Sequence, residues 1–278
     1  MKATMAGYVR ARDLSHAVAL LAASGGEARP IAGGQSLVAA MNLGLTGELQ
    51  LVDITGVDAL RGIRRDGDRL VIGALTTHAQ LGADPLVRAH VPLLHKAVPL
   101  IAHAAIRARG TIGGSLAHCD PAAELPACAL ALGARIEATG PGGSRWIDAE
   151  DFFLDTFETA LEPDEVLCAI SVPVAAADEV QMIAELARRS GDYALAGLAL
   201  VRRADGHRLA CFGADSRPVL ARGAMAALDA GDVEAAVAAL GAELDPPGDT
   251  QASAAYRRHI AGVLLRRTVI QMKEATDG

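Results

Sequence analysis

The sequence predicts an α+β fold in two unequal parts. Helical and strand-like segments alternate irregularly up to an Ala-rich, Pro-flanked stretch at 173–178, after which the pattern changes. Beyond that stretch, three consecutive strand patterns precede three helical ones, which is typical of a small antiparallel α+β unit. Hydrophobic residues make up 51% of the 278 residues, enough for a sizeable core. We therefore expect one domain over 1–175 and a second over 176–278.

The first part of the chain shows short elements separated by glycine and proline. A helix is predicted after Asp13, because Leu14, Val18 and Leu21 share one face of a 3.6-residue period. The segment 76–103 is predicted to be mostly helical, with interruptions at its prolines. Further helices are expected at 36–43 and 122–132, strands at 29–31, 50–54, 69–73 and 165–172, and a hairpin over 135–147.

The second part predicts strands first and helices afterwards. The strand patterns cover 179–188, 194–203 and 207–213, and Asp205-Gly206 is a favourable two-residue hairpin turn. Helical patterns follow near 219–229, 232–240 and 252–275. The last helix is expected to bury one stripe of apolar side chains, made of Tyr256, Ile260, Val263, Leu264 and Ile270.

Composition excludes several classes of function. A net charge of −7 argues against nucleic acid as a partner. The uncharged run 30–47 is too polar to span a membrane, and the N-terminus lacks the apolar core of a signal peptide, so a cytoplasmic protein is expected. The four cysteines form no CxxC and the eight histidines no HxxxH-type pair. We expect no metal site here, and any iron–sulfur centre on another chain.

Two Gly-Gly pairs are the most informative motif. Gly33-Gly34 and Gly113-Gly114 lie 80 residues apart, each in a stretch that could begin a helix. Glycine lets the backbone approach an anion closely, and successive N–H groups then bind phosphate oxygens. Neither pair belongs to a GxGxxG or GxxxxGK[ST] motif, which disfavours Rossmann and P-loop folds. The two pairs together predict a ligand with two phosphates.

Three segments carry a resemblance to a known family. They are Ala32-Gly33-Gly34-Gln35-Ser36-Leu37, Thr111-Ile112-Gly113-Gly114-Ser115 with Asp120-Pro121, and Arg188-Arg189-Ser190-Gly191-Asp192-Tyr193-Ala194. In this order and spacing they resemble the FAD-binding medium subunit of the molybdenum hydroxylases, which include aerobic carbon monoxide dehydrogenase and xanthine dehydrogenase. The resemblance implies an FAD domain of the vanillyl-alcohol-oxidase type over 1–175, with α/β subdomains of about 1–55 and 56–175 and the flavin between them. A C-terminal domain with a three-stranded antiparallel sheet and helices is implied beside it.

The resemblance also implies which residues bind FAD. Glu124 matches a position that bonds the adenosine ribose, and Tyr193 one that stacks near the isoalloxazine. Ordinary structural roles remain the alternatives: a surface carboxylate for Glu124, a core leucine for Leu167, a half-buried tyrosine for Tyr193 and a polar histidine for His78. The pyrophosphate loops are implied at Ala32, Gly33, Gly34, Gln35, Ser36 and Leu37, and at Thr111, Gly113, Gly114 and Ser115. Positions nearer the flavin are implied at His78, Ala102, Leu167, Asp192 and Tyr193.

Two further expectations concern charge near the flavin. His78, His103 and His118 are expected to titrate near neutral pH and so to tune a reduced flavin. Related proteins often carry a lysine where this chain has Glu185, so another group has to balance the charge that this lysine would supply.

The function implied is electron transfer within a complex. A large subunit would hold a molybdopterin-type Mo cofactor, a small subunit two [2Fe-2S] clusters, and this chain the FAD that passes electrons to an external acceptor. A dimer of heterotrimers is expected, with the segments 188–189 and 257–267 as candidates for docking the iron–sulfur subunit. The alternatives are a stand-alone FAD-dependent oxidase of the same fold and a degenerate, non-catalytic scaffold subunit. The substrate (carbon monoxide, an N-heterocycle or an aldehyde) and the electron acceptor stay open.

Overall fold

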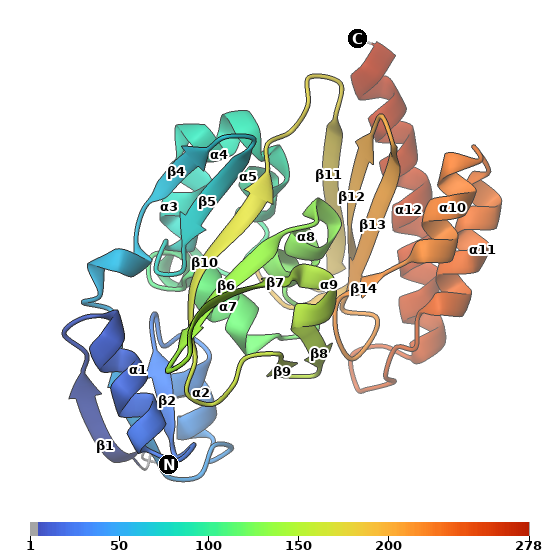
Figure 1. Cartoon of the computed structure of the whole chain (residues 1–278). Coiled ribbons are helices and arrows are strands. Elements are labelled where there is room, and N and C mark those ends of the chain that lie inside the picture. Colours follow the sequence, from blue (N-terminus) through green and yellow to red (C-terminus); the bar gives the residue numbers. More distant parts are fainter. Residues whose placement is uncertain (1–4, 278) are drawn as a thin grey trace.

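Three main sheets organise residues 5–277, the part of the chain that this computed structural model describes (Figure 1). A parallel sheet of three strands is followed along the chain by an antiparallel sheet of five strands and an antiparallel sheet of four. The predicted α+β fold class is confirmed.

The parallel sheet places the first glycine pair at its carboxyl edge. Its strands, in the order β1-β3-β2, are β1 (Met5–Arg10), β3 (Leu49–Asp53) and β2 (Ala28–Ile31). As predicted, α1 (Leu14–Ala23) begins after Asp13, whose side chain accepts the His16 N–H, and it buries Val18 and Leu21. The glycine loop joins β2 to α2 (Leu37–Asn42). Ligands commonly bind beyond the carboxyl ends of parallel strands.

The five-stranded sheet forms the centre of the molecule. The predicted hairpin over 135–147 is present as its last two strands. One edge strand was not predicted, because its sequence, IRRD, is mostly charged. In sheet order the strands are β4 (Ile63–Asp66), β5 (Arg69–Gly73), β10 (Val166–Pro173), β6 (Arg135–Gly140) and β7 (Gly143–Asp148).

Short helices cover this central sheet. The predicted helical segment 76–103 contains α3 (His78–Ala83), α4 (Pro85–His90) and α5 (Pro92–Ala97). Pro85 and Pro92 stand in the first turns of α4 and α5, where a missing N–H costs nothing. The other elements of this part are η1 (Asp58–Leu60), α6 (Ala104–Arg107), α7 (Ile112–His118), α8 (Glu124–Leu132), α9 (Ala149–Phe152), β8 (Phe153–Asp155) and β9 (Glu158–Thr159).

The C-terminal sheet has one strand more than predicted. It runs β11 (Val180–Ala187), β12 (Ala194–Arg203), β13 (Gly206–Phe212) and β14 (Val219–Leu220). The short β14 occupies the start of the segment predicted as a helix at 219–229, so α10 (Arg222–Asp229) begins later. Helices α10, α11 (Val233–Glu243) and α12 (Ala254–Asp277) lie on the side of this sheet away from the central one (Figure 1).

The predicted apolar stripe of α12 is only partly correct. Ile260 and Leu264 are buried, but Tyr256 is 48% exposed and Ile270 56% exposed. The buried face instead includes Arg257, whose guanidinium donates to Leu195 O at 2.6 Å and Gly213 O at 2.8 Å. The guanidinium also donates to Asp249 Oδ2 at 2.7 Å, so oxygen acceptors satisfy both of its Nη groups, whereas its buried Nε has no partner within residues 5–277.

Helix α8 joins the two parts of the chain. All nine of its residues are buried, and one apolar core continues from it into β12 and β13. Its last carbonyls accept hydrogen bonds from the C-terminal sheet: Arg203 donates to Leu132 O at 2.9 Å, and Arg208 to Leu130 O at 2.9 Å. Cations at a helix C-terminus also interact favourably with its dipole. The C-terminal sheet therefore fixes one end of α8.

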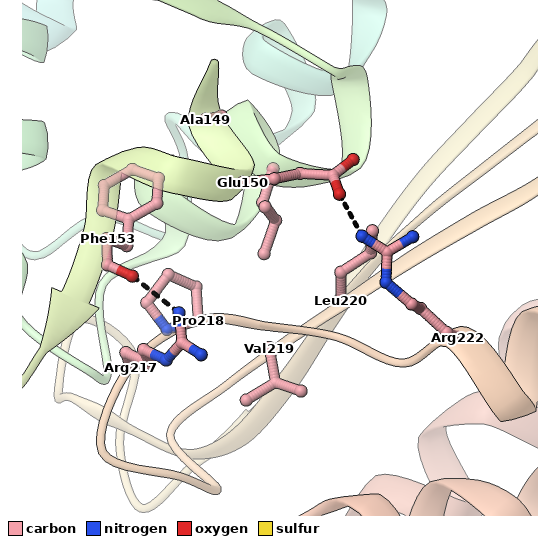
Figure 2. Close-up of a pocket in the computed structure, with 9 residues that line it drawn as sticks. Ala149, Glu150, Phe153, Arg217, Pro218, Val219, Leu220 and Arg222 are labelled. Carbon is pink, nitrogen blue, oxygen red and sulfur yellow. Dashed lines mark hydrogen bonds and ion pairs between the residues drawn. The ribbon is translucent and has the colours of Figure 1, made fainter. Parts of the chain in front are cut away.

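Ion pairs continue this junction beside α9. Glu150 pairs with Arg208. It also pairs with Arg222, and Arg217 donates to Phe153 O at 2.7 Å (Figure 2). A cavity of about 150 Å³ lies among these groups. Glu150 is held by its two arginines and Arg217 by a backbone carbonyl, so these two side chains already have partners within the protein.

Candidate cofactor-binding site

The first glycine loop offers a row of free peptide N–H groups. The N–H groups of residues 32–37 have no acceptor anywhere in residues 5–277. Gly34 adopts φ +71°, and the Gln35 side-chain amide donates to Gly33 O at 3.0 Å, which fixes the loop from within. Buried or half-buried N–H groups are normally paired, so an open row of them is a ready site for an anion.

The second glycine pair is built differently. The four N–H groups of residues 112–115 are all used internally. Their acceptors, in order, are Thr76 O at 3.0 Å, Ala74 O at 2.9 Å, Thr111 Oγ1 at 3.1 Å and Thr111 O at 3.0 Å. The expectation that both pairs offer N–H groups to phosphate is therefore wrong for the second pair.

Glycine is needed at 113 for close packing. A Cβ there would lie 2.5 Å from the Ala74 Cβ and 2.8 Å from the Ala74 O, so the start of α7 rests directly on the end of β5. What this loop can offer a ligand is hydroxyl groups, those of Thr111 and Ser115. The Ser115 hydroxyl makes no hydrogen bond within residues 5–277.

The two loops meet in space. A Cβ on Gly33 would lie 2.1 Å from the Arg109 carbonyl oxygen and 3.0 Å from the Gly110 Cα. The free N–H row of the first loop is thereby brought beside Thr111, at the start of α7. A ligand on the first loop would have the hydroxyl groups of the second within its surroundings.

A turn from the C-terminal sheet closes against the same region. Gly191, at φ +83°, lies so close to Ala102 and His103 that a Cβ on it would be 2.7 Å from His103 Cε1 and 2.8 Å from Ala102 O. Ala102 itself has φ +38°, which is unusual for a residue other than glycine. Arg107 Nη1 supports this conformation by donating to Ala102 O at 2.9 Å. The turn carries Asp192 and Tyr193 beside Ala102.

Glu124 and Tyr193 share a negatively charged environment. Glu124 is 9% exposed, and burial raises its pKa to about 7, with further contributions from Glu185 and Asp120. The Tyr193 ring is 70% exposed, but partial loss of water, and then the charges of Asp120 and Glu124, raise the pKa of its hydroxyl. Glu124, predicted to bind the ribose, and Tyr193, predicted to lie near the flavin, are therefore close enough for the charge of the first to act on the hydroxyl of the second.

His78 does not fit the expectation of titration near neutral pH. The ring is 6% exposed, and both of its nitrogens lack a hydrogen-bond partner within residues 5–277. Burial lowers its pKa to about 4, so the ring is neutral at physiological pH. A Cβ on Gly110 would lie 3.0 Å from His78 Cε1, which places the ring directly beneath the second loop. Burial also lowers the pKa of His118.

Leu167 and Ser36 show opposite environments. Leu167, on β10, is 6% exposed and belongs to the core shared by the central sheet and α8, which accounts for it without a ligand. Ser36 is exposed at the start of α2 and its side chain caps no helical N–H, so its hydroxyl is available.

Several residues of this arrangement were not predicted. Arg109 and Gly110 join the loops, Ala74 supports the second one, and Arg107 holds Ala102. For Gly110, the only signal in the sequence was that it is a glycine directly before Thr111. The other contacts depend on chain segments that meet only in the folded protein.

Comparison with known families decides what this site belongs to. Residues 3–175 match the FAD binding domain in molybdopterin dehydrogenase, and residues 181–272 match the CO dehydrogenase flavoprotein C-terminal domain. This chain belongs to the FAD-binding medium subunits of the molybdenum hydroxylases. It is thus an oxidoreductase subunit, and the resemblance inferred from the motifs is confirmed.

Individual relatives of this medium subunit cover almost its whole length. The carbon monoxide dehydrogenase medium chain of Afipia carboxidovorans is 39% identical, over 96% of both chains. The 6-hydroxypseudooxynicotine dehydrogenase complex subunit alpha of Paenarthrobacter nicotinovorans is 36% identical, over 97% of this chain and 95% of the relative. A solved carbon monoxide dehydrogenase from Hydrogenophaga pseudoflava, lacking the Mo-pyranopterin moiety of its cofactor, superimposes with a TM-score of 0.93 at 38% identity, over 96% of each chain.

Within residues 5–277 no helix is long and apolar enough to cross a membrane, and no group of three or more His, Cys, Asp or Glu side chains is placed to hold a metal ion. All four cysteines are free and buried.

Proposed function

We propose that this medium subunit holds the FAD pyrophosphate on the first glycine loop and uses the cofactor to pass electrons. The observation that carries the proposal is the row of six free N–H groups at 32–37. Phosphate oxygens readily accept hydrogen bonds from backbone N–H groups. A chain of net charge −7 needs uncharged donors of this kind where cationic side chains are scarce. Bound FAD would supply the redox chemistry, and the protein its placement and electrostatics.

The other site residues receive their roles from their positions around this loop. The hydroxyl groups of Ser36, Thr111 and Ser115 would complete the phosphate contacts. The Glu124 carboxylate, which accepts no hydrogen bond from another residue of the described chain, would accept the two ribose hydroxyls. The segment nearer the flavin would consist of His78, Ala102, Leu167, Asp192 and Tyr193.

The partners follow from the names of the relatives. One is called a medium chain and another a complex subunit, which supports a large and a small partner for this chain as well. We propose that the large partner holds a molybdopterin-type Mo cofactor and the small one two [2Fe-2S] clusters. Electrons from those clusters would reach this chain and leave to an external acceptor, in a dimer of heterotrimers.

We propose a narrower docking surface for the small subunit than the two segments as a whole. Arg266 is bound by both oxygens of Glu234, Arg258 by Leu244 O and Asp245, and Arg188 by Gln251 O. These arginines therefore already have partners within the chain. Arg189 and Arg267 are exposed and make no such bond in residues 5–277, so they are the better candidates.

Substrate choice is proposed to lie outside this chain. Relatives similar over nearly their whole length bear the names of carbon monoxide dehydrogenase and 6-hydroxypseudooxynicotine dehydrogenase, whose substrates are chemically unlike. The same kind of medium subunit thus accompanies different substrate chemistries. The large subunit would select the substrate.

Purification of the full chain, alone and with its co-expressed partners, tests the proposal. We expect a yellow protein with about one FAD per chain, no turnover by the chain alone, and flavin reduction by substrate only in the complex. A chain that refuses FAD under all conditions would refute the main proposal. Turnover of a substrate by the isolated yellow chain would instead support a stand-alone oxidase.

A further inference from the structure

An aromatic side chain at the tip of the β8–β9 hairpin is exposed and held under backbone strain. Phe157 is 57% exposed, and its φ of +57° is rare for a bulky residue. Its N–H donates at 3.1 Å to the carbonyl oxygen of Cys119, which itself has φ +48°. Such strain persists only where the surrounding structure fixes it, and it clusters at sites that bind ligands. The conformation of Phe157 therefore suggests a use for its exposed ring.

The hairpin tip is fastened on two sides. Towards α7, the Cys119 Sγ donates to Asp155 O at 3.4 Å. Towards the loop between β13 and β14, the Thr156 hydroxyl donates to Ser216 O at 2.9 Å. A side chain carried on such a fixed turn loses little freedom when a ligand binds to it. The Phe157 ring is thus presented in a fixed place.

The Phe157 ring rests on the ring of His118. The two ring centroids are 4.7 Å apart, and the planes are inclined by 32°. Burial lowers the pKa of His118, so its ring is uncharged at neutral pH. Because His118 covers one side of the Phe157 ring, the exposed surface of Phe157 is on the other side. The pair is therefore a neutral aromatic platform, on which a flat aromatic group can stack.

The platform lies close to two groups already proposed to bind the phosphate and the ribose of FAD. His118 is the last residue of α7, three residues after Ser115 on the same helix face and about 4.5 Å further along the axis. A tight turn then leads to Glu124, in which the Ala123 N–H donates to Asp120 O at 3.0 Å. Along the chain, His118 thus lies between a proposed phosphate contact and the proposed ribose contact. In FAD the adenine is attached to that ribose, so it lies within reach of the platform.

We propose that Phe157 and His118 bind the adenine of FAD, with the purine stacked on the exposed side of the Phe157 ring. This inference rests on the proposed binding of FAD, because the phosphate and ribose contacts set where the adenine begins. Stacking recognises the flat face of a base and needs no charged partner. It therefore suits the uncharged end of the cofactor, and it adds affinity that the glycine loops alone cannot supply.

The experiment measures the FAD dissociation constant of the full chain by equilibrium dialysis, with ADP and inorganic pyrophosphate as competitors. Phe157→Gly removes the ring, and glycine accepts the positive φ without strain, so the hairpin should keep its shape. We expect the affinities for FAD and ADP to fall about tenfold, the effect of losing one stacking contact with a base. The affinity for pyrophosphate, which has no base, should change less than about twofold.

Two further variants control for packing. Phe157→Tyr keeps the aromatic face and should bind FAD within about twofold of the unmodified chain. Leu154→Ala removes an apolar side chain from the same hairpin, where Leu154 is 47% exposed, and should leave all three affinities unchanged.

The outcomes separate this inference from the proposal beneath it. If the unmodified chain binds no FAD, the proposed function fails and the inference fails with it. If the unmodified chain binds FAD and Phe157→Gly binds it equally well, only the inference is overturned. Equal losses of ADP and pyrophosphate affinity in Phe157→Gly would also overturn it, since the ring would then act through the loops and not on the base. So would a Phe157→Tyr variant that binds FAD as weakly as Phe157→Gly.

Discussion

The carbonyl oxygen of Arg109 occupies the space where a side chain on Gly33 would stand. A Cβ on Gly33 would lie 2.1 Å from that oxygen and 2.7 Å from the carbonyl carbon, so even alanine cannot be accommodated without moving backbone. The contact joins two loops from different sheets. It is the point at which the free N–H row of the first loop is set against the second.

Gly33→Ala tests this contact. The methyl group has to push the loops apart, so the N–H groups and the Thr111 hydroxyl no longer converge, and FAD affinity should fall about tenfold or more. Gly142→Ala is the control, because a Cβ at Gly142 meets nothing within 4 Å. Flavin titration of both variants measures the effect. Equal affinity in the two would show that the loop contact does not shape the site.

The glycine pairs show what sequence can and cannot reveal about a site. Both pairs mark close approaches of the backbone, as the absence of a Cβ suggests. For Gly33 and Gly113, however, the approaching atoms belong to Arg109 and Ala74. The sequence contains no sign of which neighbour each glycine faces, since these contacts are between segments 39 to 76 residues apart. The free N–H row could thus be predicted for one loop and was wrongly predicted for the other.

Thr111 has a separable role as the N-cap of α7. Its hydroxyl oxygen accepts the Gly114 N–H at 3.1 Å. Thr111→Val removes the acceptor and should cost about 1 kcal/mol of unfolding free energy, whereas Thr111→Ser keeps it and should cost little. Urea unfolding of the two variants provides the comparison. A Val variant as stable as the Ser variant would contradict the capping role.

The pH dependence of stability should carry a contribution from His78. Its pKa is about 4 in the folded chain against 6.5 as the ordinary value, so the unfolded chain binds the proton more readily. The folded state is therefore favoured fully above pH 6.5 and loses stability as the pH falls toward 4, by roughly 3 kcal/mol for a shift of this size.

His78→Met removes this dependence and His259→Met, at an exposed position, should not. The measurement is the unfolding free energy at pH 4.5 and pH 7 for each variant, because the difference between the two pH values cancels any change in packing. An unchanged pH slope in His78→Met would count against burial as the cause of the shift.

The long helices and strands of the fold were easier to predict than its short edge strands. The proline-rich segment 76–103 and the three long strands of the C-terminal sheet have strong periodic patterns, and they formed where expected. The strands β4 and β14 were missed because a charged four-residue edge and a two-residue strand carry almost no pattern. The burial of the Glu185 Oε2 atom was not predicted either, because it depends on elements that pack against β11 only in the folded protein.

Arg208 should contribute more to stability than its ion pairs alone suggest. It donates to Ala131 O at 3.1 Å and Leu130 O at 2.9 Å and also pairs with Glu150, while its side chain is only 23% exposed. Arg208→Met leaves the last carbonyls of α8 without these donors in a half-buried place. The loss of several charge-assisted hydrogen bonds should cost about 2–3 kcal/mol of unfolding free energy.

Arg222 provides the matched control, because it pairs with the other oxygen of the same carboxylate but is 70% exposed. Arg222→Met should cost less than about 1 kcal/mol, as exposed ion pairs do. The pair of variants thus separates capping of α8 from charge pairing with Glu150. Since α8 begins at Glu124, its release at the far end should also weaken FAD binding in Arg208→Met and leave it unchanged in Arg222→Met. Similar losses of stability in both variants would mean that the ion pairs, and not the helix carbonyls, hold the two parts of the chain together.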